Sequence, residues 1–292
     1  MKILVLGVSG MLGNAMVRVL NEQSDWQVYG TLRSDSSKRF FNDDIRKRLL
    51  SGIDVENYDS LLQVFNQVRP NIVINCVGLI KQLAEADDPL QVIPINTLLP
   101  HRLARLCELT NTRLVHMSTD CVFSGDKGGY KETDQSDARD LYGRSKFLGE
   151  LNYANTVTLR TSIIGHELQS KHGLVNWFLS QHDRCNGYTK AIFSGLPTVA
   201  LAQVVRDLVI PNKHLTGVYH VAAQPISKYE LLHKVAEVYG KAIEIVPNEQ
   251  LVIDRSLNAD RFNNMTGYIA PSWSELIKIM HTYQLEFKLN HV

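Results

Sequence analysis

The sequence predicts an α/β fold in which a doubly wound parallel sheet is followed by a smaller C-terminal α/β lobe. Over the first 160 residues, short Val/Ile/Leu-rich runs alternate with amphipathic stretches, which is typical of parallel strands joined by crossover helices. Glycines gather at the first strand-to-helix junction. After residue 165 the alternation becomes less regular, which indicates a second structural unit.

The expected strands of the first part are nearly continuous apolar runs bounded by Gly, Asn or Ser, so we expect them to be buried on both faces. They lie at 2–7, 26–32, 71–78, 112–119 and 156–162. Helical stretches between them are expected at 11–22, 58–69, 97–110 and 140–153. Right-handed crossovers then put helices on both faces of the sheet.

The second part mixes helices and strands in a different rhythm. Ser227 and Glu230 form an S-x-x-E capping box, which predicts that a helix begins there. Other elements are expected as helices near 173–182, 199–210 and from 272, and as strands near 191–194, 217–223 and 242–247. We expect residues 1–165 to form the sheet domain, with returning segments at 195–225, and residues 166–292 to form most of the smaller lobe.

Composition excludes several classes of protein. The 292 residues carry a formal net charge of +1, so no general attraction to nucleic acid or to an anionic membrane is expected. The four cysteines have neither C-x-x-C nor zinc-finger spacing, and no metal site is expected. No apolar run reaches transmembrane length. We therefore expect a cytoplasmic protein with reduced thiols.

The stretch LGVSGMLGN places Gly7, Gly10 and Gly13 between the first strand and the first helix. Glycines there permit a tight turn, a close approach of the backbone to a pyrophosphate, and close packing of the helix on the strand. The free N–H groups at the helix N-terminus favour an anion. We therefore predict a dinucleotide-binding, Rossmann-type domain, with Ser9, Met11 and Leu12 beside the cofactor.

The end of the second strand indicates which dinucleotide binds. NAD sites usually place an acid there, whereas this chain has Arg33 and Ser34, with Lys38 nearby. A guanidinium suits a 2′-phosphate, so NADP(H) is the preferred cofactor. Asp35 is close enough in sequence to contact a ribose, which leaves NAD(H) open.

Tyr142 and Lys146 are four residues apart and share one helix face. Ser118 and Thr119 end a predicted strand, and ligands of such sheets bind at the carboxyl ends of the strands. A tyrosine can donate a proton to the oxygen that becomes negative when a ketone is reduced, and we expect the nearby ammonium to lower the phenol pKa. Thr119 is assigned to the substrate carbonyl and Ser118 is the alternative, because an alternating strand points one of them into the site.

The glycine array, STDCVFSG (118–125), YGRSK (142–146) and LRTS (159–162) together resemble the extended short-chain dehydrogenase/reductases. Within that superfamily the chain most resembles the dTDP-4-dehydrorhamnose reductase group, with further matches at FSGLPT (193–198) and in the closing segment from Arg255. The resemblance runs from residue 2 to about 280. It implies a Rossmann-type domain, a small substrate lobe and reduction of a 4-keto-6-deoxy sugar nucleotide for surface polysaccharide precursors. It also implies Thr119, Tyr142 and Lys146 as the catalytic set.

The same resemblance suggests further cofactor contacts. Asp54 and Val55 correspond to an adenine-contacting Asp-aliphatic pair, which in the superfamily follows that fold's third strand. The segment Cys76, Val77 and Gly78 follows the strand that leads to the nicotinamide. Asn96 matches an asparagine that positions a water or the lysine, although helix capping is an equal alternative.

Several departures from the family pattern concern the substrate. Cys121 replaces the tyrosine of S-T-D-Y, and the loop NCVGLIKQ (75–82) brings Lys81 to the cleft. Lys81 and His166 could hold a phosphate, a carboxylate or an N-acyl group, and ordinary surface charge is the alternative. Trp177 and Arg255 are the remaining candidates for substrate contact.

Two other functions compete with a reductase. A nucleotide-sugar epimerase of the same superfamily usually retains NAD, which Arg33 disfavours, and a 4,6-dehydratase requires an acid at Cys121. A non-catalytic, NADP-binding regulatory subunit is the alternative from a different class. A homodimer is compatible with any of them.

Overall fold

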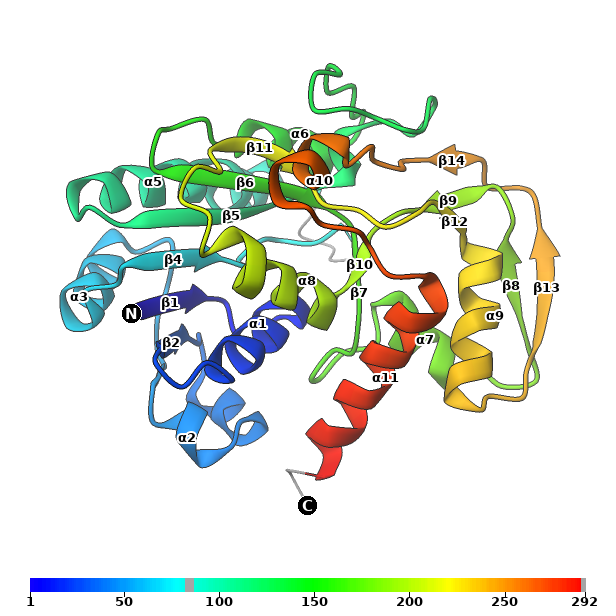
Figure 1. The fold of residues 1–292 in the computed structure, drawn as a ribbon, viewed down its shortest axis with the longest axis horizontal. Helices are drawn as coiled ribbons and strands as arrows, with labels where there is room; N and C mark the ends of the chain where they lie inside the picture. Colours follow the sequence, from blue (N-terminus) through cyan, green and yellow to red (C-terminus); the bar gives the residue numbers. More distant parts are fainter. Residues whose placement is uncertain (82–86, 290–292) are drawn as a thin grey trace.

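The computed structural model describes residues 1–81 and 87–289 of the chain. At its centre is a seven-stranded parallel sheet with strand order β11-β6-β5-β4-β1-β2-β3 (Figure 1). The strands are β1 (Lys2–Leu6), β2 (Gln27–Thr31), β3 (Leu49–Leu50), β4 (Ile72–Asn75), β5 (Arg113–Thr119), β6 (Thr156–Thr161) and β11 (Gly217–His220). The strand order reverses between β1 and β4, and the carboxyl ends of strands at such a point are where open α/β sheets bind ligands.

Helices cover both faces of the sheet because the side chains of each strand alternate in direction. In β1, Ile3 and Val5 belong to the core on one face, whereas Leu4 and Leu6 belong to the core on the other face. The first face is covered by α1 (Met11–Asn21) and α8 (Thr198–Val204), which pack against each other. The second face is covered by α3 (Tyr58–Val68) and α5 (Leu99–Leu109), as Figure 1 shows.

Several short helical segments complete the crossovers of this domain. They are η1 (Asp35–Phe40), α2 (Asp43–Arg46), α4 (Pro89–Val92), the π-helical segment η3 (Ile93–Leu98), η4 (Asp120–Val122), α6 (Leu141–Leu148) and the π-helical segment η5 (Val205–Val209). α6 packs on η3 and on the end of β5. The segments η3, η4 and α6 therefore gather at the carboxyl edge of the sheet.

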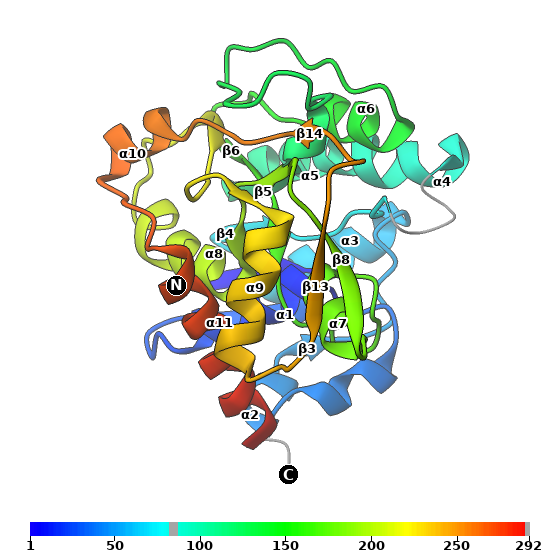
Figure 2. The ribbon, with the colours of Figure 1, turned by 90° about the vertical axis from the view of Figure 1, so that its right-hand side faces the viewer.

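Most of the C-terminal lobe lies beside the sheet, on the right in Figure 1 and towards the viewer in Figure 2, whereas its helix α10 packs on β11 of the sheet. Its helices are α7 (Leu174–Ser180), α9 (Lys228–Tyr239), α10 (Asp260–Thr266) and α11 (Trp273–Leu289). Its strands are β7 (Ile163–Ile164), β8 (Arg184–Tyr188), β9 (Ala191–Phe193), β10 (Leu196–Pro197), β12 (Ile226–Ser227), β13 (Glu244–Asn248) and β14 (Ile253–Asp254). They form three small sheets, β12-β9-β14, β13-β8 and β10-β7.

The predicted fold class is confirmed, and most predicted elements agree with the structure to within a few residues. The capping box is present: Ser227 accepts a hydrogen bond from the Glu230 amide, and Glu230 returns one to the Ser227 amide. The helix predicted over 140–153 ends earlier, at Leu148, because Gly149 caps it. The strand β11, which follows the lobe segments β7 to β10 in sequence, pairs with β6 in the central sheet. Within the described residues, no helix is both long and apolar enough to cross a membrane.

Candidate active site

The glycine turn joins β1 to α1 in the way the sequence predicts. Gly7 has φ = 79°, a region that favours glycine, and its amide donates to Thr31 Oγ1 at 3.2 Å. The Gly10 amide donates to the Gly7 carbonyl at 3.1 Å. A Cβ atom on Gly13 would lie 2.1 Å from the Gly7 carbonyl oxygen. Gly13 therefore allows the first turn of α1 to lie directly on the turn that leaves the strand.

The beginning of α1 fits a pyrophosphate. Among the residues that the structure describes, no side chain caps this helix and no acid lies in its first turn. Ser9 and Gly10 are exposed, and a Cβ on Gly10 would meet only the Gly7 carbonyl oxygen at 3.4 Å. The N–H groups of the first turn can therefore donate to an anion. Met11 is half-buried beside Gly173, whereas Leu12 is in the core, so Leu12 can offer only its backbone.

The end of β2 presents the groups predicted for the ribose phosphate. Arg33 and Ser34 are exposed, and Ser34 caps η1 by accepting from the Ser36 amide. The Asp35 carboxylate is already bound to Lys38 at 2.8 Å and to Ser51 at 2.7 Å. The Asp35 carboxylate is therefore already paired with a cation, and the Arg33 and Ser34 side chains remain exposed beside it.

The residues predicted for the adenine lie after β3. Asp54 is exposed, and its carboxylate accepts from the Glu56 amide at 3.0 Å. Val55 is half-buried and packs against the core of the second face. Both therefore lie in an ordered turn, with the Asp54 side chain in solvent.

The end of β4 lies between the glycine turn and α6. The Cys76 amide donates to the Leu6 carbonyl, and Val77 is the nearest side chain to a Cβ built on Gly7. A Cβ on Gly78 would lie 3.4 Å from Asn96 Oδ1 and 3.8 Å from Lys146 Nζ. The segment 76–78, predicted to face the nicotinamide, therefore lies between the glycine turn at 7–13, here called the phosphate cradle, and Lys146.

Asn96 lies in the π-helical segment η3 and is buried. Its Oδ1 accepts from the Leu79 amide at 2.9 Å, and its Nδ2 lies 3.1 Å from the Leu79 carbonyl and 3.3 Å from Ser145 Oγ. Thr97 also donates to the Ser145 carbonyl. The π-helical turn, a feature often found at functional sites, thus locks the loop after β4 onto α6. Helix capping, the alternative role considered for Asn96, would instead require a bond to an amide in the first turn of its own helix.

Thr119 and Tyr142 meet at the carboxyl edge of the sheet. Asp140 caps α6 by accepting from the Gly143 amide at 2.8 Å, which places Tyr142 in the first turn of the helix. Thr119 at the end of β5 is among the groups that act on the Tyr142 phenol, and its own hydroxyl donates to Asp120 Oδ1 and accepts from the Cys121 amide, both at 3.1 Å. Burial, followed by repulsion from Cys121, raises the pKa of Tyr142 above its usual value. The prediction that a neighbouring ammonium lowers this pKa is wrong, because desolvation dominates, and the phenol stays protonated at neutral pH.

Lys146 is buried one turn further along α6. Its Nζ donates at 2.7 Å to the carbonyl of Met117, two residues before Thr119 on β5. Burial lowers the pKa of Lys146 to about 8, although the charge of Glu150 opposes this shift. The Cys76 thiol next to it has its pKa raised by burial to about 12, so it stays protonated. The ammonium is therefore mostly charged at neutral pH and begins to lose its proton slightly above it.

A cluster of charged groups surrounds the same phenol on the side of the C-terminal lobe. Arg255 donates through Nε to the Phe123 carbonyl at 2.7 Å and through Nη1 to Cys121 Sγ at 3.7 Å. Asp120 is buried, and its hydrogen-bond partners include Thr119. Burial raises the pKa of Asp120, and the positive charge of Arg255 opposes the shift. Arg255 thus reaches from the lobe to the segment that follows β5, and its predicted contact with the substrate stays a prediction.

Two further cations approach this cluster. Lys81 forms an ion pair with Asp140 at 2.6 Å, at the start of α6. Lys228 lies within electrostatic reach of Asp120 and Arg255, and the sequence analysis missed it. A lysine in the first turn of a helix is unfavourable for the helix dipole, so its position directly after the cap Ser227 was an available signal.

Other predicted substrate residues lie in different surroundings. Ser118 donates to Glu150 Oε1 at 2.7 Å, so its hydroxyl is bound on the side of the strand away from Thr119. His166 Nε2 lies 2.8 Å from the Tyr239 hydroxyl of α9. Trp177 is 37% exposed on α7. The structure therefore brings Thr119, Tyr142, Lys146 and Arg255 together and gives Ser118 and His166 other partners.

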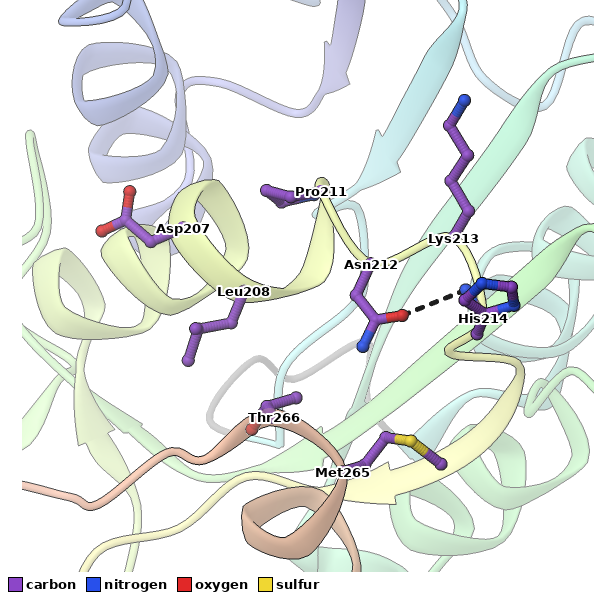
Figure 3. A pocket seen from close by; sticks show the side chains of 8 residues that line it. All are labelled: Asp207, Leu208, Pro211, Asn212, Lys213, His214, Met265 and Thr266. Carbon is purple, nitrogen blue, oxygen red and sulfur yellow. Dashed lines mark hydrogen bonds between the residues drawn. The ribbon is translucent and has the colours of Figure 1, made fainter.

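A surface pocket of about 480 Å³ lies elsewhere, between the end of η5 and α10 (Figure 3). Its lining residues are Asp207, Leu208, Pro211, Asn212, Lys213, His214, Met265 and Thr266. The segment 211–214 precedes β11, so the pocket adjoins the amino end of this strand, opposite the carboxyl edge that carries Tyr142. It does not belong to the candidate site.

Comparisons with known proteins bear on the family and the fold of this chain. Residues 1–271 match the family described as RmlD substrate binding domain. The chain is 24% identical over 301 residues to dTDP-4-dehydrorhamnose reductase of Aggregatibacter actinomycetemcomitans, covering 98% of this chain and 94% of that protein. It is 23% identical over 252 residues to methionine adenosyltransferase 2 subunit beta of Xenopus laevis, covering 81% and 72%.

Among solved structures, dTDP-4-dehydrorhamnose reductase from Bacillus anthracis in complex with NADP is similar with a TM-score of 0.78 at 22% identity. The similarity covers 97% of this chain and 98% of that one. At this identity it demonstrates the fold. Since the family match extends over nearly the whole chain, this protein belongs to the RmlD substrate binding domain family.

Proposed function

We propose that this protein reduces the 4-keto group of a nucleotide-linked 6-deoxy sugar with NADPH, in the cytoplasmic synthesis of surface polysaccharide precursors. The observation that carries the proposal is the position of Tyr142 and Lys146 one turn apart on α6, beside Thr119 at the end of β5, with Lys146 Nζ bound to the Met117 carbonyl of that strand at 2.7 Å. These three side chains converge at the carboxyl edge of the sheet, next to a glycine turn that fits a pyrophosphate.

Each residue has a distinct role in this proposal. A bound reduced nicotinamide would supply the hydride. The neutral Tyr142 phenol donates its proton to the carbonyl oxygen as negative charge develops there, and its raised pKa keeps that proton available. Thr119, whose hydroxyl donates to Asp120 Oδ1 in this structure, would turn that proton to the same oxygen and orient it. Lys146, charged at neutral pH, holds the nicotinamide ribose and stabilises the phenolate that remains after proton transfer.

The cofactor is proposed to be NADP(H). Arg33 and Ser34 are exposed at the end of β2, and Asp35 is occupied by Lys38 and Ser51, so this position favours a phosphate. The relative from Bacillus anthracis was solved with NADP, which supports the same choice. The ratio of kcat/KM for NADPH and NADH tests it, and a strong preference for NADH would contradict it.

The sugar nucleotide is proposed to bind between the sheet domain, residues 1–165, and the lobe formed mostly by residues 166–292. Arg255 reaches from the lobe to Cys121 and Phe123, which follow β5, the strand that ends at Thr119. Its guanidinium, with Lys81 and Lys228 nearby, provides positive charge for the anionic part of the substrate.

A second candidate is a non-catalytic subunit that binds NADP and a partner protein. The similarity to methionine adenosyltransferase 2 subunit beta favours it, because the name of that relative denotes a subunit of a different enzyme. The intact set of Thr119, Tyr142 and Lys146 favours the reductase instead.

The experiment that separates the two is NADPH oxidation with a panel of dTDP-, UDP- and GDP-linked 4-keto sugars. Wild type is expected to oxidise NADPH with at least one of them. Tyr142→Phe should bind NADPH with unchanged affinity and lose most of the activity, because only the donated proton is removed. Wild type that binds NADPH and turns over no member of the panel would refute the reductase and support the subunit.

A further inference from the structure

A pair of charged side chains is buried directly beneath the candidate site. The Glu150 carboxylate accepts two hydrogen bonds from Arg160, from Nε and from Nη2, both at 2.6 Å. The side chains of Arg160 and Glu150 are 4% and 6% exposed. Replacing such a pair with apolar side chains is often neutral or stabilising, so a gain in stability is a weak explanation for its presence.

Glu150 also forms a hydrogen bond with β5, the strand that carries Thr119. Ser118 Oγ donates to Glu150 Oε1 at 2.7 Å, and Glu150 is its only hydrogen-bond partner within the part of the chain that the structure describes. Ser118 lies between Met117, whose carbonyl accepts from Lys146, and Thr119. Successive strand residues point to opposite faces, so fixing Ser118 from behind fixes how both neighbours face the site.

The same glutamate is anchored to the helix that carries the phenol and the ammonium. The Glu150 amide donates to the Phe147 carbonyl at 3.0 Å, directly after α6 ends. A Cβ on the preceding Gly149 would lie 2.0 Å from the Asn96 carbonyl oxygen, so the end of α6 packs tightly on η3. Glu150 therefore connects the end of α6 to the tip of β5, at a point where α6 has no room to shift towards η3.

Arg160 extends this connection to the C-terminal lobe. Its Nη1 lies 3.2 Å from His220 Nε2, and His220 Nδ1 lies 3.1 Å from the carbonyls of Tyr130 and Asn258. Two carbonyl partners assign the ring proton to Nδ1, so Nε2 accepts from Arg160. Burial, followed by the charge of Arg160, lowers the pKa of His220 to about 3 and keeps the ring neutral. The carboxylate is thus held rigidly from below.

We propose that Glu150 is a positioning residue for the reduction. From its place just after α6 it binds Ser118 on β5, and it thereby sets the position of Thr119 relative to Tyr142 and Lys146. The proposal rests on the proposed function, because it assigns Glu150 a role in that reaction. A purely structural residue would affect only stability, whereas Glu150 is expected to affect kcat and the protonation of Lys146.

The charge of Lys146 depends on the groups that face it from three elements. Burial lowers its pKa to about 8, while Glu150 after α6 and Cys76 after β4 raise it. His116 on β5 stays neutral, because burial and then the Lys146 charge lower its pKa. Removal of the Glu150 charge is therefore expected to lower the pH at which Lys146 loses its proton.

Ser118→Ala tests the positioning role, because it removes the link to β5 and leaves the Glu150–Arg160 pair intact. We expect kcat to fall at least about tenfold, as for the loss of a hydrogen bond to a charged group, with the NADPH Kd unchanged. Thr112→Val is the matched control, since it removes a buried hydroxyl that donates to the Pro70 carbonyl just before the other end of β5. Its kcat should equal that of wild type.

Glu150→Gln tests the effect on charge through a measurement that needs no turnover. The amide oxygen can still accept from Ser118, while the negative charge is lost. NADPH binding, followed by cofactor fluorescence from pH 6 to 9.5, should weaken in wild type above about pH 8 as Lys146 loses its proton. In Glu150→Gln the midpoint should move to lower pH by at least about half a unit.

Two results would overturn the proposal: wild-type kcat in Ser118→Ala, or an unchanged midpoint of NADPH binding in a folded Glu150→Gln. If Glu150→Gln does not fold, Ser118→Ala decides. A wild type without turnover on any sugar nucleotide would instead refute the proposed function, and the pH dependence of NADPH binding would still test the role of Glu150.

Discussion

Substitution of Gly13 by alanine should damage the protein by a mechanism that can be worked out from the structure. The added Cβ would lie 2.1 Å from the Gly7 carbonyl oxygen, 2.8 Å from its carbon and 2.9 Å from the Val8 Cα. All three atoms are backbone, so no side chain can rotate away. The helix and the turn would have to separate by roughly 1.3 Å before an ordinary contact of 3.4 Å is restored.

The expected size of this effect combines two opposing terms. Overpacking of a well-packed site typically costs about 1–3 kcal/mol, and forced movement of backbone puts this site at the upper end. Alanine in place of glycine within a helix returns about 1 kcal/mol. We therefore expect a net loss of about 2 kcal/mol in the free energy of unfolding, together with at least tenfold weaker NADPH binding because the phosphate cradle is displaced.

Gly10→Ala is the matched control. Its Cβ would meet only the Gly7 carbonyl oxygen at 3.4 Å, so the apoprotein should lose less than about 1 kcal/mol, mainly from the poorer helix cap. Its methyl group would be added at the N-cap of α1, beside the free N–H groups of the first turn, so NADPH binding should still weaken. Urea unfolding of the apoproteins and NADPH titration measure both quantities. Equal stability of Gly13→Ala and wild type would refute the packing argument.

Three further predictions follow from individual contacts. The kcat/KM of wild type should be constant near neutral pH and fall above about pH 8, because Lys146 with its lowered pKa loses its charge there; a profile that is flat to pH 9.5 would contradict this. Ser227→Ala removes the cap of α9 and should lower the free energy of unfolding by about 1 kcal/mol in urea, with unchanged NADPH affinity. Arg33→Ala should raise the KM for NADPH several-fold and leave the KM for NADH unchanged, and an equal effect on both cofactors would argue against a phosphate contact.

The central sheet could be predicted from the sequence because its strands are apolar runs that only a buried parallel sheet accommodates. The glycine turn could be predicted equally well, since each glycine is required there for its own steric reason: Gly7 for its positive φ, and Gly13 for the close contact with the Gly7 carbonyl. The strand β3 could not be predicted, because two leucines give no periodicity. The strand β8 was also missed: its sequence, RCNGY, contains no apolar run, and it pairs with β13, which lies about 60 residues away in sequence.

The site was predictable where spacing within one element decides it, as for Tyr142 and Lys146 on α6. It was less predictable where contacts come from distant segments. Ser118 and Thr119 could be separated by strand alternation, but nothing local shows that Glu150 binds Ser118. The contact of His166 with Tyr239 likewise depends on the packing of the lobe. The pKa of Tyr142 was misjudged because burial is a property of the assembled fold.

The most direct test of the reductase is transfer of deuterium from NADPH labelled at nicotinamide C4 to a 4-keto sugar nucleotide, read by mass spectrometry of the product. Wild type should deliver one deuterium to the new carbinol carbon, and Tyr142→Phe should do so at a small fraction of that rate. A wild-type protein that binds NADPH tightly and transfers no deuterium to any sugar nucleotide in the panel would contradict the assignment of Thr119, Tyr142 and Lys146 to this reaction.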